Sequence, residues 1–306
     1  MSQGISEFSF LAADAAVVGR SAPLPPVERV WLNAQVSALR WGEGAATIVL
    51  LHGVALNAHT WDATLLAWPQ SASFLALDLP GHGDSPWRAD GRYSPSVLAE
   101  TPPAALAAAG ERGWLEATPT IVGHSLGGLT AIEMIRTSAM ALRRLVLVDI
   151  LPLPAGAART VAEFLNGPAW FASREAIVER ALAFGLGGER AAVERGVFLN
   201  TRLDADGRVI WKHHFGQLGG SALHLPDPEQ VWPIIQHSSV PIDLVAASQS
   251  FIDAALAERF ARSRPGGRLR RVAGGHNLQE DNPIQLAATL AELVGPRGVE
   301  PAAAGA

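Results

Sequence analysis

A serine flanked by glycines, in residues 123–128 with the sequence GHSLGG, constrains this chain more than any other feature. The apolar run Thr120–Val122 precedes it and a helix-compatible run, Leu129–Ile135, follows it, so the pattern predicts a strand, a sharp turn and a helix. On such a turn Ser125 adopts strained backbone angles and neighbouring Cβ atoms would collide, which explains the glycines at 123 and 127. A serine that only caps a helix needs no such glycines. The turn therefore presents Ser125 as a candidate nucleophile.

Three other segments give this turn its context. Residues 48–54 (IVLLHGV) read as a buried strand that ends in His-Gly, and residues 75–85 (LALDLPGHGDS) as a strand that ends in a tight Pro-Gly turn. Residues 271–277 (RVAGGHN) read as a short strand that opens into a loop carrying His276. A single G-x-S-x-G match is weak because any glycine-rich loop can produce it, but these segments in this order make the match specific.

With these segments the chain resembles the α/β-hydrolase superfamily, and more narrowly its cap-bearing, esterase- and lactonase-like serine hydrolases, over roughly Val27 to Val294. The resemblance implies a doubly wound, mostly parallel, eight-stranded α/β sheet with a helical cap insertion. It also implies carboxylic ester hydrolysis by a catalytic triad, with neither cofactor nor metal. A serine nucleophile argues against dehalogenase and epoxide-hydrolase chemistry. Carbon–carbon hydrolases and perhydrolases use the same triad and stay open, as does a ligand-binding receptor with little turnover.

Composition agrees with this class. The chain has 306 residues, 48% of them hydrophobic, enough for one large core with an insertion. A net charge of −5 without a basic cluster argues against nucleic acid and anionic membranes as partners. The absence of cysteine excludes disulfides and thiolate chemistry. No apolar run approaches the ~18 residues of a membrane helix. We therefore expect a cytoplasmic enzyme acting on a small molecule, with a homodimer left open.

Alternating apolar runs and helical patterns predict the order of the elements. A hairpin over Val27–Leu32 and Val36–Arg40 would form an antiparallel edge of the sheet. The other expected strands are Thr47–Leu51, Ser73–Asp78, Thr120–Val122, Leu145–Asp149, Ile242–Ala246 and Leu269–Val272. The expected helices are Trp61–Trp68, Val97–Ala109, Leu129–Arg136, Ala254–Arg262 and Ile284–Leu293.

The chain divides into a core and an insertion. About ninety residues separate the strand ending at Asp149 from the strand beginning at Ile242, far more than one crossover helix needs. We expect residues 151–225 to form a helical cap over Ser125, because insertions at the carboxyl ends of parallel strands lie where ligands bind. The alternative is a set of decorating helices with a core of their own. Expected cap helices are Thr160–Leu165, Arg174–Ala183 and Glu189–Phe198.

The remaining boundaries follow from composition. Residues 27–150 and 226–295 would form the hydrolase core. Residues 1–26 read as an irregular, poorly tethered N-terminal arm, and the residues 296–306, rich in Pro, Ala and Gly, as a tail that frays.

The resemblance assigns roles to residues around Ser125. His276 would act as the general base, because it follows the last strand and precedes the last helix, where this fold carries its histidine. The oxyanion hole needs two backbone donors. The resemblance places one at the Leu126 N–H and the other in the loop after His52-Gly53, most simply the Val54 N–H.

The acid of the triad departs from the common pattern. Most relatives carry Gly-x-x-Asp after the strand Ile242–Ala246, and here the matching position holds Ser250. Asp253 lies three residues later and also suits a helix N-cap. Asp149 ends the preceding strand in an acid-before-proline context like that of certain haloalkane dehalogenases. We predict Asp149 as the acid, with Asp253 as the alternative.

Several other polar residues invite a catalytic interpretation that the sequence does not favour. His52, His82 and His124 lie in glycine-flanked turns and would shape loops. Because His213 and His214 are adjacent, they point in different directions and fit the surface or the cap wall. No histidine pair has metal-ligand spacing. Further structural expectations are that Asp78 and Asp84 stabilise a turn, that Glu280 and Asp281 cap the last helix, and that Trp61 lines the pocket or packs under the loop.

Overall fold

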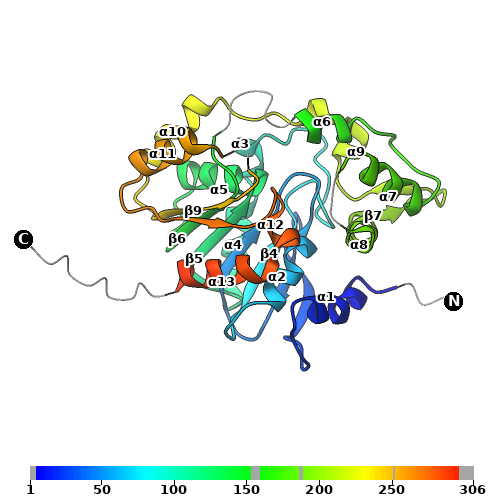
Figure 1. Cartoon of the computed structure of the whole chain (residues 1–306), viewed down its shortest axis with the longest axis horizontal. Coiled ribbons are helices and arrows are strands. Elements are labelled where there is room, and N and C mark those ends of the chain that lie inside the picture. The colour runs from blue at the N-terminus through cyan, green and yellow to red at the C-terminus, as the bar shows by residue number, and fades with distance from the viewer. Residues whose placement is uncertain (1–4, 153–158, 186–188, 251, 296–306) are drawn as a thin grey trace, which may run out of the picture.

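The computed structural model describes residues 5–152, 159–185, 189–250 and 252–295 (Figure 1). Its centre is an eight-stranded sheet in the order β1-β2-β4-β3-β5-β6-β9-β10. Strand β2 is antiparallel to β1 and to β4, and the other neighbouring strands run parallel. The expected doubly wound, mostly parallel sheet with an antiparallel edge is confirmed. Its strands are β1 Val27–Asn33, β2 Val36–Trp41, β3 Ala46–Leu51, β4 Phe74–Leu77, β5 Leu115–His124, β6 Arg144–Val148, β9 Ile242–Ala247 and β10 Leu269–Val272.

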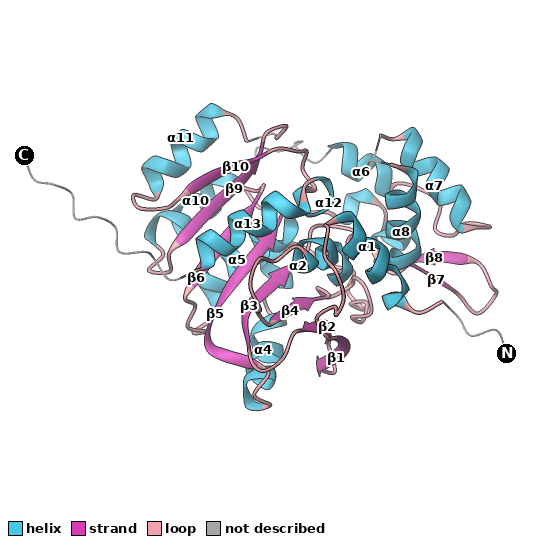
Figure 2. Cartoon of the chain, turned by 60° about the horizontal axis from the view of Figure 1, so that its bottom comes forward, coloured by secondary structure: helices cyan, strands magenta, loops and turns pink. Residues whose placement is uncertain are grey.

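Helices cover both faces of the sheet (Figure 2). In β3, Val49 and Leu51 pack into one apolar cluster, whereas Ile48 and Leu50 pack into the other. Because side chains alternate along a strand, a strand buried on both faces reads as a continuous apolar run. The first face is covered by α4 Pro102–Glu111, α5 Leu126–Thr137, α10 Pro228–His237 and α11 Ala254–Ser263, and the second by α1 Leu11–Val17, α2 Asp62–Leu66, α12 Leu278–Asp281 and α13 Pro283–Val294.

The single helix predicted over Val97–Ala109 is wrong. The structure has a short helix α3, Pro95–Leu98, and then α4, which begins at Pro102. A proline has no N–H to donate and its ring clashes with the preceding turn, so it fits the first turn of a helix and is disfavoured further along it. The Pro102-Pro103 pair therefore ends one helix and starts the next.

The N-terminal arm is more ordered than expected. A 3₁₀ turn, η1 Glu7–Phe10, leads into α1, and Leu11 and Ala15 of α1 are buried in the same cluster as Trp61 and Leu65. The Asp14 carboxylate lies 2.7 Å from the guanidinium of Arg195, on a helix of the insertion. An apolar stripe and an ion pair thus tether a segment whose alanine-rich sequence gave little sign of packing.

The chain between β6 and α10 is the predicted insertion, and we call its residues 159–225 the inserted segment. Its elements are α6 Arg159–Leu165, α7 Arg174–Ala183, α8 Arg190–Asn200, β7 Thr201–Leu203, β8 Val209–Trp211, α9 Phe215–Leu218 and the 3₁₀ turn η3 Gly220–Ala222. The three expected helices are present within two residues, and the hairpin β7-β8 was not predicted. In Figure 1 these elements gather on one side of the molecule, away from β9.

Two apolar clusters describe how the inserted segment packs. One is its own core, which includes Phe171, Ile177 and Trp211. The other joins Leu165 and Phe215 of the segment to Leu126, the neighbour of Ser125. The segment therefore has a private core and also reaches the serine turn. No helix of the described residues is long and apolar enough to cross a membrane.

A buried imidazole connects the arm to the core. His59, in the 3₁₀ turn η2 Ala58–Trp61, is 1% exposed, and its Nδ1 and Nε2 lie 2.8 Å and 3.1 Å from carboxylate oxygens of Asp62 and Glu7. Burial alone would lower the pKa of His59, but contacts with Asp62 and Glu7 outweigh burial and the repulsion from Arg29 and raise it to about 9. The imidazole is therefore charged at neutral pH.

This raised pKa predicts a pH-dependent stability. The folded pKa lies above the ordinary 6.5, so the contribution of His59 is complete below about pH 6.5 and is lost as the pH rises through about 9. The difference corresponds to on the order of 3 kcal/mol. The free energy of unfolding, measured with urea, should fall between about pH 6 and about pH 10. The fall should be larger in wild type than in H59Q. Equal losses in the two proteins would contradict a charged His59.

Candidate active site

Ser125 lies on a strained turn between β5 and α5. Its backbone angles are φ 51° and ψ −119°, a positive φ that non-glycine residues rarely adopt. A Cβ on Gly123 would lie 2.6 Å from the Cα of Gly128, and one on Gly127 would lie 2.5 Å from the Leu51 carbonyl oxygen. Strand and helix therefore approach so closely that these positions require glycine.

His276 and Asp149 meet Ser125 through a continuous line of hydrogen bonds. The Nε2 atom of His276 lies 3.0 Å from the Ser125 Oγ, and its Nδ1 lies 2.8 Å from the Asp149 Oδ2. Asp149 is fully buried, and its Oδ1 accepts a hydrogen bond of 2.8 Å from the Ala247 N–H at the end of β9. Both carboxylate oxygens are thus held, one by the sheet and one by His276.

The two candidate acids have separate environments. Asp149 follows β6 with a positive φ of 47°, which turns it toward the His276 loop. Asp253 is exposed, and its Oδ1 accepts from the Leu256 N–H as the N-cap of α11. The hydroxyl of Ser250 accepts a hydrogen bond from the Ile252 N–H. Of the carboxylates that the sequence left open, the structure brings Asp149 to His276.

The two residues expected to supply the oxyanion hole come from the loop after β3 and from the start of α5. A Cβ on Gly53 would be 3.3 Å from the Cβ of Ser125, so the loop carrying Val54 passes directly against the serine turn. Val54 and Leu126 pack in the same apolar cluster. Within the described part of the chain, neither the Val54 N–H nor the Leu126 N–H donates a hydrogen bond.

His52 and His82 shape loops, as the sequence suggested. His52 is buried, its Nδ1–H donates to the Gly53 carbonyl, and its Nε2 accepts from the Leu79 N–H, so it joins the two loops that follow β3 and β4. His82 is buried and donates from Nδ1 to the Pro80 carbonyl. Burial lowers the pKa of both imidazoles, which keeps them neutral.

His214 fastens the inserted segment to the loop after β4, and His213 is buried next to it. His213 is 1% exposed, which excludes a surface position. The His214 N–H donates to the Gly81 carbonyl, its Nδ1 lies 2.8 Å from the Tyr93 hydroxyl, and its ring stacks on Trp87. His214 therefore connects the inserted segment to the core, a structural role that the sequence did not reveal.

The expectation that Glu280 and Asp281 cap the last helix is wrong. Asn282 caps α13, with its side chain accepting from the Gln285 N–H. Glu280 accepts from the Thr60 hydroxyl, and Asp281 accepts from the Gly275 N–H, one residue before His276. Asp281 therefore holds the loop that carries His276, whereas Glu280 joins α12 to η2.

Asp78 and Asp84 stabilise the Pro-Gly turn, as expected. Asp78 accepts from the Asp84 N–H across the Pro-Gly turn, and the guanidinium of Arg29 pairs with both carboxylates. Trp61 is fully buried in the apolar cluster on the second face of the sheet. In the described residues, no group of three or more His, Asp or Glu side chains could hold a metal ion.

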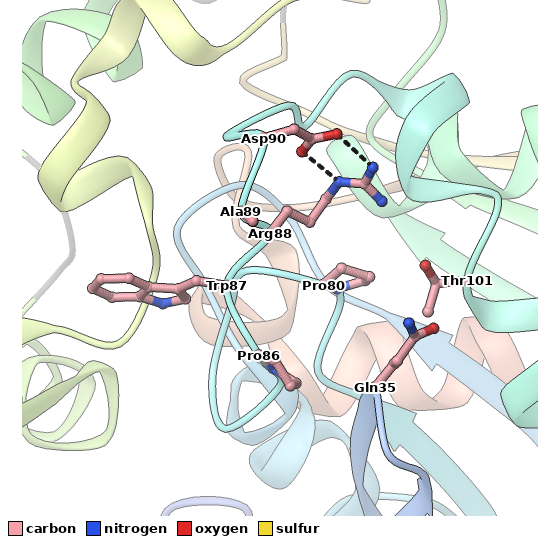
Figure 3. A pocket seen from close by; sticks show the side chains of 8 residues that line it. All are labelled: Gln35, Pro80, Pro86, Trp87, Arg88, Ala89, Asp90 and Thr101. Carbon is pink, nitrogen blue, oxygen red and sulfur yellow. Dashed lines mark hydrogen bonds and ion pairs between the residues drawn. The ribbon is translucent and has the colours of Figure 1, made fainter.

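A cavity of about 390 Å³ opens near the turn after β4 (Figure 3). Its walls include Pro80, Pro86 and Trp87, and none of Ser125, His276 or Asp149 lines it. Arg88 at its rim makes two hydrogen bonds to the Asp90 carboxylate, so its charge is already paired. This cavity is separate from the serine turn.

Comparison with known proteins gives consistent matches. The model of the alpha/beta hydrolase family matches residues 48–289. Esterase Rv0045c of Mycobacterium tuberculosis is 36% identical over 299 residues, which cover 92% of this chain and 94% of that protein. The crystal structure of that esterase superposes with a TM-score of 0.81 at 33% identity and covers 97% of this chain and 100% of its own. Lipase LipV of the same organism is 27% identical over 277 residues, covering 84% of this chain and 97% of LipV.

Proposed function

The chain belongs to the alpha/beta hydrolase family, and from this premise we propose that it is a serine esterase. It cleaves an ester, lactone or related acyl bond of a fairly apolar small molecule through an acyl-enzyme on Ser125. The observation that carries the proposal is the line of contacts from Ser125 Oγ to His276 and on to Asp149, at 3.0 Å and 2.8 Å. The similarity to an esterase over 92% of the chain supports the same reaction class.

The proposed mechanism uses each group in turn. His276 Nε2 takes the proton of Ser125 as Oγ attacks the substrate carbonyl, and the buried Asp149 stabilises the resulting imidazolium. The Val54 and Leu126 N–H groups donate to the oxyanion of the tetrahedral intermediate. His276 then gives the proton to the leaving alcohol. Water deprotonated by His276 attacks the acyl-enzyme, and the acid product leaves with Ser125 restored.

Apolar side chains around the serine turn support an apolar substrate. Leu126 packs with Leu165 and Phe215 of the inserted segment, and Val54, Leu218 and Leu223 are half-buried against this cluster. Half-buried aliphatic groups beside a nucleophile gain free energy by covering an aliphatic chain, about 25 cal/mol per Å² of apolar surface removed from water. We therefore assign residues 151–225 as a cap whose inner wall holds the apolar part of the ester.

Two alternatives share the scaffold. A carbon–carbon hydrolase or a perhydrolase would use the same three side chains, and the half-buried apolar wall favours neither over an esterase. A receptor with little turnover was suggested by Ser250 at the usual position of the acid. Asp149, which follows the neighbouring strand β6, places a carboxylate against His276. The serine at position 250 is therefore a weaker argument for a receptor.

Ester turnover and covalent labelling test the proposal together. We expect p-nitrophenyl esters to be hydrolysed with a KM that falls as the acyl chain lengthens, until the apolar wall is covered. A fluorophosphonate probe should label wild type rapidly and S125A not at all. EDTA should leave the rate unchanged, since no step of the mechanism requires a metal. A folded protein that neither labels nor hydrolyses any of the esters would overturn the esterase assignment.

A further inference from the structure

His124, the residue immediately before Ser125, contacts the backbone of the residue proposed as the base. Its Nε2 lies 2.9 Å from the carbonyl oxygen of His276, and the two imidazole rings are 4.7 Å apart between centroids, inclined at 46°. A carbonyl oxygen can only accept, so the proton of His124 is on Nε2. The hydrogen bond therefore joins the serine turn directly to the His276 loop.

The position of His124 is fixed by its strand, by its burial and by the neighbouring loop after β3. It is the last residue of β5, paired in register with Val148 of β6, and its side chain is 1% exposed. A Cβ on Gly53 would lie 2.7 Å from the Nδ1 of His124, so the loop after β3 lies directly against the ring. Because this side chain cannot move relative to the sheet, a group that it binds is also held at a fixed position relative to the sheet.

His276, by contrast, lies in a loop. Residues 273–277 follow β10 without helix or strand, and Gly274 has a φ of 141°. A loop needs contacts from rigid elements to hold a side chain within the few tenths of an ångström that proton transfer requires. The His124 hydrogen bond supplies one such contact, at the carbonyl of the residue itself.

The charge state of His124 suits this role. Burial, together with the neighbouring His276, lowers its pKa well below the ordinary value, so the ring stays neutral. No group of the described residues bonds to its Nδ1. A neutral donor can hold His276 without opposing the positive charge that His276 acquires during the reaction.

We propose that His124 is a positioning residue that fixes His276 relative to Ser125 through the hydrogen bond from its Nε2–H to the His276 carbonyl. This inference rests on the proposed serine esterase mechanism. It assigns to the residue before the nucleophile a role in the geometry of the base rather than in the shape of the turn alone. His124 itself touches neither substrate nor transferred proton.

Steady-state kinetics of H124F and H124Q test the proposal. Phenylalanine fills the space of the ring but cannot donate, so kcat should fall about tenfold or more while KM changes less than about twofold. Glutamine carries an N–H at a similar reach and should restore most of the rate. The rate of fluorophosphonate labelling should follow kcat. If H124F does not fold, H124N, whose amide is too short to reach the carbonyl, replaces it.

H82F is the matched control, because it removes another buried histidine, one whose Nδ1 donates to the Pro80 carbonyl rather than to that of His276. Its kcat should stay within about twofold of wild type even if its melting temperature falls. The proposal is overturned if folded H124F, or H124N in its place, keeps the wild-type kcat. It is also overturned if kcat falls as much in H124Q as in H124F. Absence of ester turnover in wild type would instead overturn the proposed function, so the two failures are distinguishable.

Discussion

Replacing Ser125 or His276 with alanine is expected to remove nearly all ester turnover, by roughly 10⁴-fold or more in kcat, while the protein stays folded. The two side chains act on one proton, at a separation of 3.0 Å between Oγ and Nε2. Without the hydroxyl no acyl-enzyme forms, and without the imidazole the hydroxyl keeps its proton. The double variant should therefore be little worse than either single variant, because members of one catalytic unit fail together.

Matched controls separate this effect from a general loss of structure. Ser96 and His237 are exposed, and S96A and H237A should keep wild-type kcat. Circular dichroism and the midpoint of thermal unfolding should be similar in all four single variants. More than a few per cent of wild-type activity in folded S125A or H276A would contradict the proposed roles, as would a double variant whose loss is the product of the single losses.

The nucleophile turn could be predicted because its close packing requires glycines, which are visible in the sequence itself. A Cβ at position 123 or 127 would lie 2.5–2.8 Å from backbone atoms, and one at position 128 would lie 2.4 Å from the Ile150 side chain. The central strands could be predicted for a similar reason. A strand covered on both faces has no polar alternation, and Ile48–Leu51 shows this directly.

Features that depend on distant partners were not predicted. The arm helix α1 is held by an ion pair between Asp14 and Arg195, which are 181 residues apart. The bonds of Glu280 to Thr60 and of His124 to the His276 carbonyl are equally long-range. A sequence read by local periodicity contains no information on such pairs. The hairpin β7-β8 is different, since the Asp-Ala-Asp-Gly turn at residues 204–207 is a local signal that could have indicated it.

The sequence narrowed the acid of the triad to Asp149 and Asp253 but could not decide between them from local signals. Each follows a strand of the parallel sheet, and β6 and β9 are neighbours, so both residues belong to the same edge. Sequence order alone cannot say which carboxylate turns toward His276. The structure distinguishes them by backbone conformation and burial, with a positive φ at the buried Asp149 and an exposed N-cap at Asp253.

Asp149→Asn and Asp253→Asn should accordingly have opposite consequences. In the serine-protease example, removing the charge of the triad acid lowers kcat about 10⁴-fold because the histidine takes the wrong tautomer. We expect a similar loss in D149N. We expect D253N to keep wild-type kcat, because asparagine caps a helix about as well as aspartate and Asp253 is exposed.

The surroundings of Asp149 determine which tautomer His276 would adopt in D149N. Its Oδ1 accepts from the Ala247 N–H, so in D149N the amide oxygen is held there and the NH₂ group faces His276 Nδ1. An NH₂ group can only donate, which forces the His276 proton onto Nε2, where it blocks acceptance of the Ser125 proton. The measurement is kcat of both variants at pH 7 to 9, with folding checked by circular dichroism. A fully active D149N beside an inactive D253N would move the acid to the loop after β9, and two active variants would leave His276 working without a carboxylate.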